Sequence, residues 1–163
     1  MDLGIPFDMN LRERISAATK QAMKDKATDR LSTLRLINAA IKDRDIAARA
    51  EGIDGGVDDT VIMAILGKMV KQRRESARTY EEGGRLDLAE RELAEVEIIE
   101  EYLPKPLSKK EISKAVDGAV EEVGASSIRD MGRVMGVLKA RYQGQMDFGA
   151  VGPMVKERLA NAS

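Results

Sequence analysis

The sequence predicts an all-α protein, with an N-terminal helical domain that contains a long helical hairpin and a small C-terminal three-helix domain. Of the 163 residues, 43% are hydrophobic but only 3% are aromatic, so aliphatic side chains must fill the core, which suits helices better than sheets. Apolar residues recur at three- and four-residue spacing through most of the chain. Pro104 and Pro106 interrupt this pattern, because neither can donate a helical hydrogen bond, and they predict a domain boundary.

The first two expected helices follow each other closely. The first begins at Asn10, which forms a capping-box pattern with Glu13, and ends near Ala27. The second is capped by residue 28 or 29 and ends at Gly52, before a glycine-containing loop over residues 53–57. Their inward-facing stripes are Leu11, Ile15, Ala18, Ala22 and Met23 in the first helix, and Leu31, Leu34, Ile37, Ile41 and Ala48 in the second.

The third and fourth expected helices form an antiparallel hairpin. Asp58 or Asp59 begins the third helix, and Gly83 with Gly84 ends it in a sharp reversal of the chain. The fourth helix has a near-heptad apolar pattern, which is typical of a helix that packs along another helix. This series is Leu86, Ala89, Leu93, Val96 and Leu103, with Ile99 completing the stripe.

Two helices open the C-terminal domain, and each has its own start signal. Ser108 and Glu111 form a capping box before the first helix, and Ser127 with Asp130 begins the second. Glycines at positions 124 and 144 end them. Their inward-facing residues are Ile112, Ala115, Val116, Ala119, Val120 and Val123 in the first, and Met131, Val134, Met135, Leu138 and Tyr142 in the second.

The last helix contains a proline. Asp147 caps a final irregular turn, and Pro153 is expected in the first turn of a short helix that reaches Ala160. The predicted organisation is therefore an N-terminal helical domain over residues 1–103, a proline-containing linker over residues 104–107 and a three-helix domain over residues 108–163.

The composition excludes many kinds of enzyme. The chain has no His and no Cys, which removes Ser-His-Asp triads, cysteine nucleophiles, zinc fingers and disulfide frameworks. We expect no catalytic residues, no cofactor and no metal site. The first ten residues resemble neither a signal peptide nor a transit peptide, and no apolar run approaches the roughly 20 residues that span a bilayer. The sequence therefore predicts a cytoplasmic protein without a membrane partner.

The C-terminal domain is the basic part of the chain. Residues 105–163 hold 10 basic and 7 acidic side chains, whereas residues 1–104 hold 17 and 21. Gly132 and Gly136 lie inside a predicted helix, where each costs about 1 kcal/mol relative to Ala, so something must approach their face closely. Arg129 and Arg133 share that face, and Lys139 and Arg141 extend it. This face predicts contacts with RNA phosphates; the alternative is that a neighbouring helix packs on the glycines.

A secondary basic face lies on the third expected helix. Lys71, Arg74 and Arg78 share it at three- and four-residue spacing, and such a face can follow phosphates. The alternative is ion pairing across the hairpin, because the fourth helix is strongly acidic. Its glutamates scatter around the helix and predict a charged exterior, not paired catalytic carboxylates: Glu90, Glu92, Glu95, Glu97, Glu100 and Glu101.

Several separate motifs resemble those of the GatB/YqeY family, in the expected order and over nearly the whole chain. They are Arg30-Leu-Ser-Thr-Leu-Arg35, Ala39-Ala-Ile-Lys42, Lys68-Met-Val-Lys-Gln-Arg-Arg-Glu-Ser76, Glu100-Glu-Tyr-Leu-Pro104 and the stretch from Gly124 to Gly136. The resemblance implies a stand-alone YqeY-like protein whose C-terminal domain is similar to the tail of the GatB subunit of glutamine-dependent tRNA amidotransferase.

The resemblance also implies a function. In the amidotransferase the tail engages tRNA, while the cradle domain and the amidase subunit perform the chemistry, and this chain is too short to contain either. We therefore expect a noncatalytic tRNA-binding or amidotransferase-accessory protein, with a carbon-nitrogen ligase association at the family level only. Its expected partners are tRNA and an amidotransferase or aminoacyl-tRNA synthetase component, and no DNA. Two alternatives remain: a helical protein-interaction module without RNA binding, and an enzyme in its own right.

Overall fold

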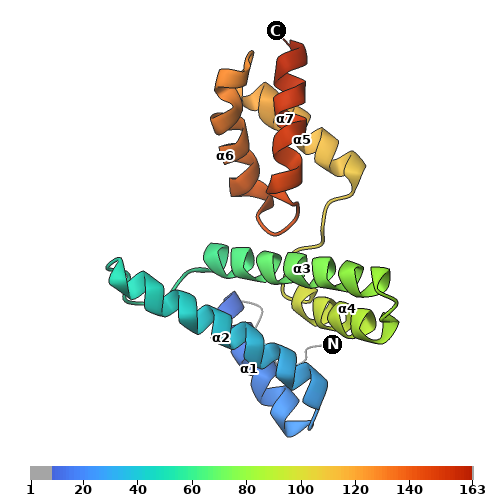
Figure 1. The fold of residues 1–163 in the computed structure, drawn as a ribbon. Helices are drawn as coiled ribbons and strands as arrows, with labels where there is room; N and C mark the ends of the chain where they lie inside the picture. Colours follow the sequence, from blue (N-terminus) through green and yellow to red (C-terminus); the bar gives the residue numbers. More distant parts are fainter. Residues whose placement is uncertain (1–8, 163) are drawn as a thin grey trace, which may run out of the picture. The chain divides into compact units, whose positions relative to one another are not determined.

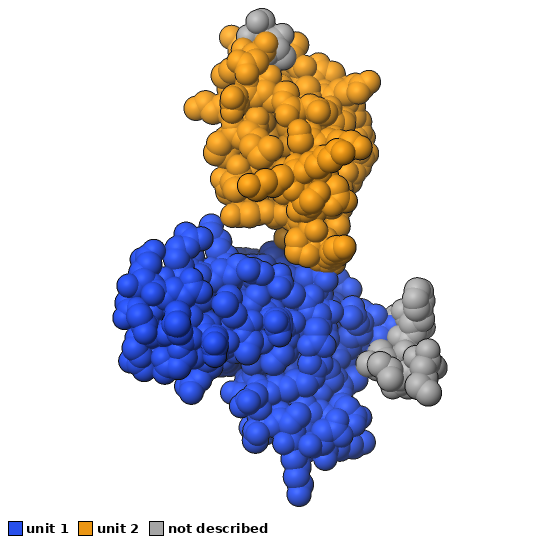
Figure 2. All heavy atoms as spheres, turned by 90° about the vertical axis from the view of Figure 1, so that its right-hand side faces the viewer, with its two compact units in different colours: residues 1–103 blue, residues 104–163 orange. Residues whose placement is uncertain are grey.

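The computed structural model describes residues 9–162, and the described part is helical throughout, with turns and loops but no strand (Figure 1). The predicted all-α class is confirmed. The chain divides after Leu103 into two compact units, which Figure 2 shows in blue and orange. No helix of the described part is both long enough and apolar enough to cross a membrane.

Unit 1 consists of four helices: α1 (Leu11–Lys24), α2 (Thr28–Ala50), α3 (Asp59–Glu82) and α4 (Leu86–Glu100). The helices α3 and α4 lie side by side as the predicted hairpin, α1 packs on α2, and α2 also packs on α4 (Figure 1). The core between them is almost entirely aliphatic. Its most deeply buried large side chains are Ile15, Leu34, Ile37, Ile62, Leu66 and Ile99.

Unit 2 consists of α5 (Lys109–Val123), a 3₁₀ turn η1 (Ile128–Asp130), α6 (Met131–Tyr142) and α7 (Phe148–Ala162). Its three α-helices pack on one another around a separate aliphatic core. The fully buried large side chains of this core are Val116, Val134, Leu138, Val151, Val155 and Leu159.

Local chemistry explains where the helices begin. The side chains of Asn10, Asp58 and Ser108 accept hydrogen bonds from the backbone N–H groups of the first turns of α1, α3 and α5. Ser127 caps the η1 turn in the same way. The predicted capping box at Ser108 is complete, and Ser127 forms one with Asp130, whereas at Asn10 the Glu13 side chain accepts from the Asn10 side-chain amide instead of its backbone N–H. At the end of α5, Gly124 adopts a left-handed φ of 70°, a conformation that glycine adopts without steric cost.

Several expectations about individual positions are wrong. Met23, expected on the inward stripe of α1, is 54% exposed, and the N-cap of α2 is Ala27, which makes no side-chain cap, instead of residue 28 or 29. The last helix begins at Phe148, so Pro153 lies inside α7 instead of in its first turn. The proline is tolerated because it removes only the hydrogen bond to the carbonyl of Gly149, which is exposed to water. Leu86 and Leu93, expected on the inward stripe, are 62% and 36% exposed, because Ala89, Val96 and Ile99 supply the contact with α3.

Candidate functional site

The turn before α6 is held by a compact set of hydrogen bonds. The Ser127 hydroxyl accepts from the backbone N–H of Arg129 at 3.3 Å, while the Asp130 carboxylate accepts from the N–H groups of Ser126 and Ser127 at 2.9 and 3.3 Å. The hydrogen bond from the Ser126 N–H, and then that from Arg133, lower the pKa of Asp130. Local hydrogen bonds among residues 126–130 thus fix the turn from which α6 begins.

The outer side of α6 carries two glycines that no described residue covers. Gly132 and Gly136 are exposed, whereas Val134 and Leu138 on the opposite side are fully buried in the core. A Cβ atom added to either glycine would meet no heavy atom of residues 9–162 within 4 Å. The expectation that a neighbouring helix of the domain packs on these glycines is therefore wrong, since no described residue does so.

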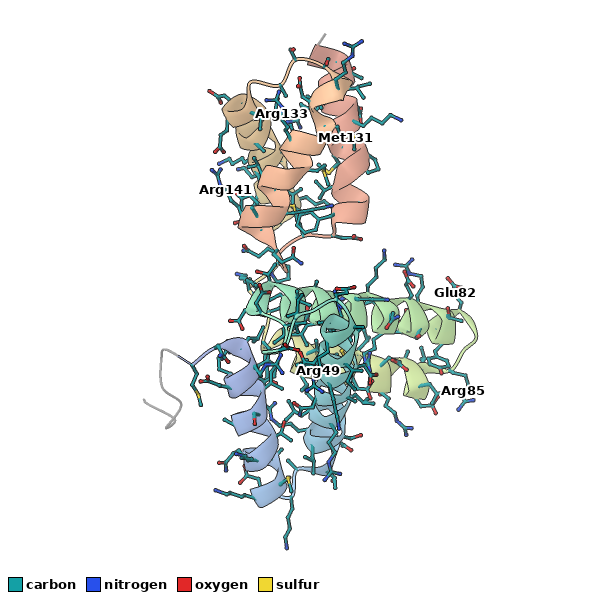
Figure 3. The ribbon with its side chains drawn as sticks, turned by 90° about the vertical axis from the view of Figure 1, so that its left-hand side faces the viewer. Arg49, Glu82, Arg85, Met131, Arg133 and Arg141 are labelled. Atoms are coloured by element: carbon teal, nitrogen blue, oxygen red, sulfur yellow. The ribbon has the colours of Figure 1, made fainter. Side chains whose placement is uncertain are left out.

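The cations around these glycines fall into two groups. Arg133 donates to the Asp130 carboxylate at 2.6 Å, and Arg141 donates to Glu122 of α5 at 2.6 Å. Figure 3 shows these two arginines near opposite ends of α6. Arg129 and Lys139 are exposed, and neither side chain has a hydrogen bond or ion pair with any residue in the described part of the chain.

Helical spacing puts most of these residues on one side. We call the set Arg129, Gly132, Arg133, Gly136 and Lys139 the α6 face. Apart from the adjacent pair Gly132 and Arg133, its neighbouring members are separated by three or four residues, from the η1 turn to the last turn of α6. Arg141 is tied to α5 by its ion pair with Glu122. The structure thus brings together two free cations, one paired arginine and an uncovered stretch of helix backbone.

The secondary basic face on α3 is partly neutralised. Arg74 donates from Nη2 to both carboxylate oxygens of Glu100 at 3.2 Å, and the neighbouring Arg73 donates to Glu95 at 2.9 Å. The expected ion pairing across the hairpin is confirmed for these arginines. Lys71 and Arg78 are exposed and form no ion pair with described residues.

Two motifs that carry the family resemblance meet in unit 1. Arg30 of α2 donates to Glu101 at 2.6 Å and to the Tyr102 hydroxyl at 3.0 Å. The Arg14 guanidinium lies over the ring of Tyr102, 5.7 Å from its centroid. Burial raises the pKa of the Tyr102 phenol. These contacts join α1 and α2 to the end of α4, so their role is to hold the unit together.

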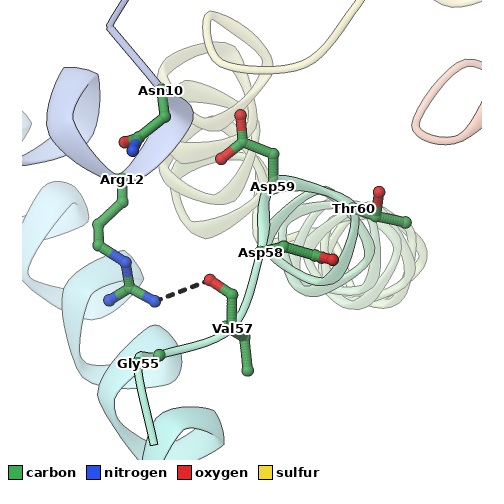
Figure 4. A pocket seen from close by; sticks show the side chains of 8 residues that line it. Asn10, Arg12, Gly55, Val57, Asp58, Asp59 and Thr60 are labelled. Atoms are coloured by element: carbon green, nitrogen blue, oxygen red, sulfur yellow. Dashed lines mark hydrogen bonds between the residues drawn. The ribbon is translucent and has the colours of Figure 1, made fainter. Parts of the chain in front are cut away.

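Sequence reasoning missed a polar cluster at the loop between α2 and α3, of which Figure 4 shows Arg12 with its hydrogen bond to Val57. Arg12 makes two hydrogen bonds to Asp45, at 2.8 and 2.9 Å, and a third to the Val57 carbonyl at 3.0 Å. Asp45 also accepts from the Val57 N–H at 2.9 Å. The hydrogen bonds from Arg12, and next that from Val57, hold the pKa of Asp45 at about 2.

Gly56 shows why this loop needs glycine. Its φ is +86°, and a Cβ atom added there would lie 2.9 Å from the guanidinium of Arg12. Asp59 extends the cluster, because its carboxylate accepts from the N–H of Leu11 at 3.2 Å. Each charged side chain of the cluster has a hydrogen-bond partner within unit 1, so the cluster fixes the loop. The adjacent glycines followed by two aspartates were the signal that could have found it.

No group of three or more His, Cys, Asp or Glu residues in the described part of the chain is arranged to hold a metal ion. The glutamates of α4 that point to α3 or α2 are engaged by arginines, as Glu95, Glu100 and Glu101 show. Within residues 9–162, the arrangement that can engage a ligand best is therefore the α6 face, whose chemistry suits an anionic backbone.

Comparison with known proteins gives a family and several fungal relatives. A family model described as Yqey-like protein matches residues 12–159. A relative named "Altered inheritance of mitochondria protein 41, mitochondrial" from Clavispora lusitaniae is 37% identical over 66% of this chain and 61% of its own length. Relatives with the same name from Lachancea thermotolerans and Pyrenophora tritici-repentis are 32% and 29% identical, over 66% and 78% of this chain and 57% and 71% of their own lengths. The chain thus spans about three fifths of the first two relatives.

These names correct one expectation. The sequence predicts a cytoplasmic protein, but the relatives from all three fungi are named as mitochondrial proteins. The cytoplasmic prediction is therefore wrong by this comparison. It rested on the absence of a leader-like pattern in the first ten residues, eight of which lie outside the described part of the structure.

Proposed function

Because the chain belongs to the family of Yqey-like proteins, we propose that it is a noncatalytic RNA-binding protein whose α6 face contacts the phosphate backbone of folded RNA. The resemblance to the GatB tail makes tRNA the expected RNA. In this proposal Arg129 and Lys139 supply the main charge, and Gly132 with Gly136 let the RNA backbone approach the helix closely.

The uncovered glycines are the observation that carries the proposal. A glycine inside a helix costs about 1 kcal/mol relative to alanine, and two occur within five residues of α6. No described atom of the chain packs where their Cβ atoms would be, so folding of the chain gains nothing from them. A close approach by a ligand in the complex is a physical reason for this cost.

The charges of the face support an anionic ligand. Phosphate contacts fix the position of a nucleic acid without reading its bases, and they need only exposed cations. Arg129 and Lys139 form no ion pair with a described residue, so they can contact a phosphate without breaking one. Arg133 and Arg141 must first release the carboxylates of Asp130 and Glu122. We therefore expect the two free cations to contribute more affinity than the two paired arginines. Recognition by backbone and shape is usual for folded RNA.

The glycines give a test in which stability and binding change in opposite directions. Replacing both, Gly132→Ala with Gly136→Ala, should stabilise the protein by about 0.5 to 1 kcal/mol for each site, since the positions are helical and open. The same change should weaken binding to bulk tRNA in a fluorescence anisotropy titration, because two methyl groups hold the backbone away. Gly118→Ala in α5 is the matched control, also helical and open, and should stabilise without weakening binding.

The cations give a second test. Arg129→Ala with Lys139→Ala should lower the affinity for different tRNAs by similar factors, and should flatten the slope of log affinity against log salt by on the order of one to two units. Lys20→Ala with Lys24→Ala is the control, because it removes two exposed cations of α1 that form no ion pair with a described residue and lie on neither basic face; it should leave the affinity and the slope unchanged. Wild-type affinity and an unchanged slope in the Arg129/Lys139 variant would remove the α6 face from the RNA site.

The same proposal makes the protein an accessory to an amidotransferase or an aminoacyl-tRNA synthetase, as the resemblance implies. The chain's own part is to hold RNA, and no residue is assigned to chemistry. Pure protein should therefore hydrolyse no glutamine and transfer no amide nitrogen to charged tRNA. Glutamine hydrolysis that a single point substitution abolishes would show that the protein is an enzyme in its own right.

A further inference from the structure

The outer side of α2 is unusually apolar for a surface helix. Leu36 and Ile46 are 45% and 53% exposed on it, and the exposed alanines 39, 47 and 50 lie on the same side. Residues 36, 39, 43, 46 and 50 follow the alternating three- and four-residue spacing of a helix seam, with Asp43 as its polar member. In unit 1 itself, α2 packs through the opposite side, which holds Leu34, Ile37 and Ile41.

A row of cations borders this seam. Arg35, Lys42 and Arg49 are exposed and follow each other at seven-residue intervals, which is about 10.5 Å along a helix. None of them forms an ion pair with a described residue. Arg49 is labelled in Figure 3, where it lies on α2. We call the seam and its three cations the α2 face.

The outer side of α4 has the opposite charge. Leu86 and Leu93 are 62% and 36% exposed and seven residues apart. Glu90 and Glu97 are exposed beside them at the same seven-residue interval, and neither forms an ion pair with a described residue. We call these four residues the α4 face. It presents apolar residues along one side of the helix, as the α2 face does, with carboxylates in place of cations.

We propose that the α2 face of one copy of this protein docks on the α4 face of a second copy. The apolar residues of the two faces pack against each other. Because the cations of the α2 face and the carboxylates of the α4 face both repeat at about 10.5 Å, they can form ion pairs along the contact. A second copy is favoured over RNA because the α4 face offers apolar partners for Leu36 and Ile46 together with carboxylates at the matching interval, whereas a phosphate backbone offers only charge. A lipid surface is disfavoured because the α2 face has no aromatic residue to enter a membrane.

Asp43 sets the expected strength of this association. A polar residue in a helix seam lowers affinity while it fixes the register. The contact is therefore reversible and depends on concentration. Sedimentation velocity of the full chain over a hundredfold range of concentration should show an average mass that rises with concentration and falls with added salt. A protein that stays monomeric over the whole range overturns the proposal.

A charge exchange tests which surfaces meet. Arg35→Glu with Lys42→Glu in one variant, and Glu90→Lys with Glu97→Lys in another, should each weaken self-association at least about tenfold. An equimolar mixture of the two should associate again, because each reversed face then meets its complement. Lys109→Glu with Lys110→Glu in α5 changes the net charge as much as the α2 variant and should self-associate like the wild type.

Two outcomes of this experiment contradict the proposal. The first is self-association of either reversed variant at wild-type strength, or a mixture that fails to associate although circular dichroism shows both variants folded. The second is a monomeric wild type that binds anionic phosphatidylserine vesicles through the α2 face, which would assign the face to a lipid surface. Neither result depends on whether α6 binds RNA.

Discussion

The arginines of the two units have different roles. In unit 1, Arg12 is tied twice to Asp45, whose side chain is only 15% exposed, and Arg73 is tied to Glu95 with both side chains largely buried. In unit 2 the arginines that form ion pairs on α6 are exposed, and that region also carries two exposed cations that no described carboxylate neutralises. Arg12 and Arg73 thus stabilise the fold of unit 1, whereas exposed cations such as Arg129 and Lys139 in unit 2, and Lys71 and Arg78 in unit 1, remain available to a ligand.

The comparison teaches that the number of cations predicts little by itself. The part of the chain up to residue 104 holds more basic residues than the part after it, 17 against 10. In that part, however, arginines of α3 face glutamates of α4, so several of its charges are neutralised by ion pairs within unit 1. The partner on the neighbouring helix decides whether an arginine is structural or free.

The largest loss of stability is expected when Asp45, the well-buried carboxylate of unit 1, is removed. Asp45→Ala leaves the Val57 N–H and the Arg12 guanidinium without their acceptor, and should lower the free energy of unfolding by about 2 kcal/mol. Urea titration followed by circular dichroism measures the change. Glu122→Ala breaks an exposed pair in unit 2 and should cost less than about 0.5 kcal/mol.

Protonation of the Asp45 carboxylate at low pH should reproduce part of the loss of stability expected for Asp45→Ala. The pKa of Asp45 is about 2 in the folded protein, against an ordinary value of 3.8, so its contribution to stability is complete above pH 4 and is lost as the pH falls toward 2. The stability difference between wild type and Asp45→Ala should therefore narrow over this interval. A difference that stays constant from pH 5 to pH 2.5 would show that the carboxylate charge is not what holds the loop.

A smaller difference in stability is expected between substitutions of two ion-paired arginines, one in each unit. Arg73→Ala should lower the free energy of unfolding by about 1 kcal/mol, because Glu95 is then left partly buried without its cation. Arg133→Ala should change it by less than about 0.5 kcal/mol, because that side chain is 65% exposed and Asp130 keeps its hydrogen bonds from the N–H groups of Ser126 and Ser127. Equal losses in the two variants would contradict the division of roles between the units.

The starts of α1, α3 and α5 were predictable from the sequence because capping is local. A side chain such as Asn10 or Ser108 bonds to backbone groups two or three residues away, so its partner is visible in the sequence itself. The hairpin was predictable for a similar reason, since Gly83 and Gly84 allow only a short connection between two long apolar patterns. These signals determine elements, and they also indicated which elements are neighbours.

The details of the site depended on contacts between distant residues. Asp45 meets Arg12 across 33 positions, and no local pattern connects them. The near-heptad series on α4 correctly indicated a packed helix, but its period could not tell that Ala89 and Val96 face α3 while Leu86 and Leu93 face outward. Likewise, the sequence places Arg129 and Arg133 on one face, but only the structure shows that one is free and the other is held by Asp130.

The proline within α7 gives the beginning of that helix its own dynamics. Because Pro153 cannot bond to the carbonyl of Gly149, the turn from Phe148 to Gly152 is joined to the rest of α7 by fewer backbone hydrogen bonds. Gly149 and Gly152 also favour the unfolded chain entropically. In hydrogen-exchange terms, this turn should open without global unfolding, so the amide of Val151 should exchange faster than those of Val155 and Leu159 although all three side chains are buried.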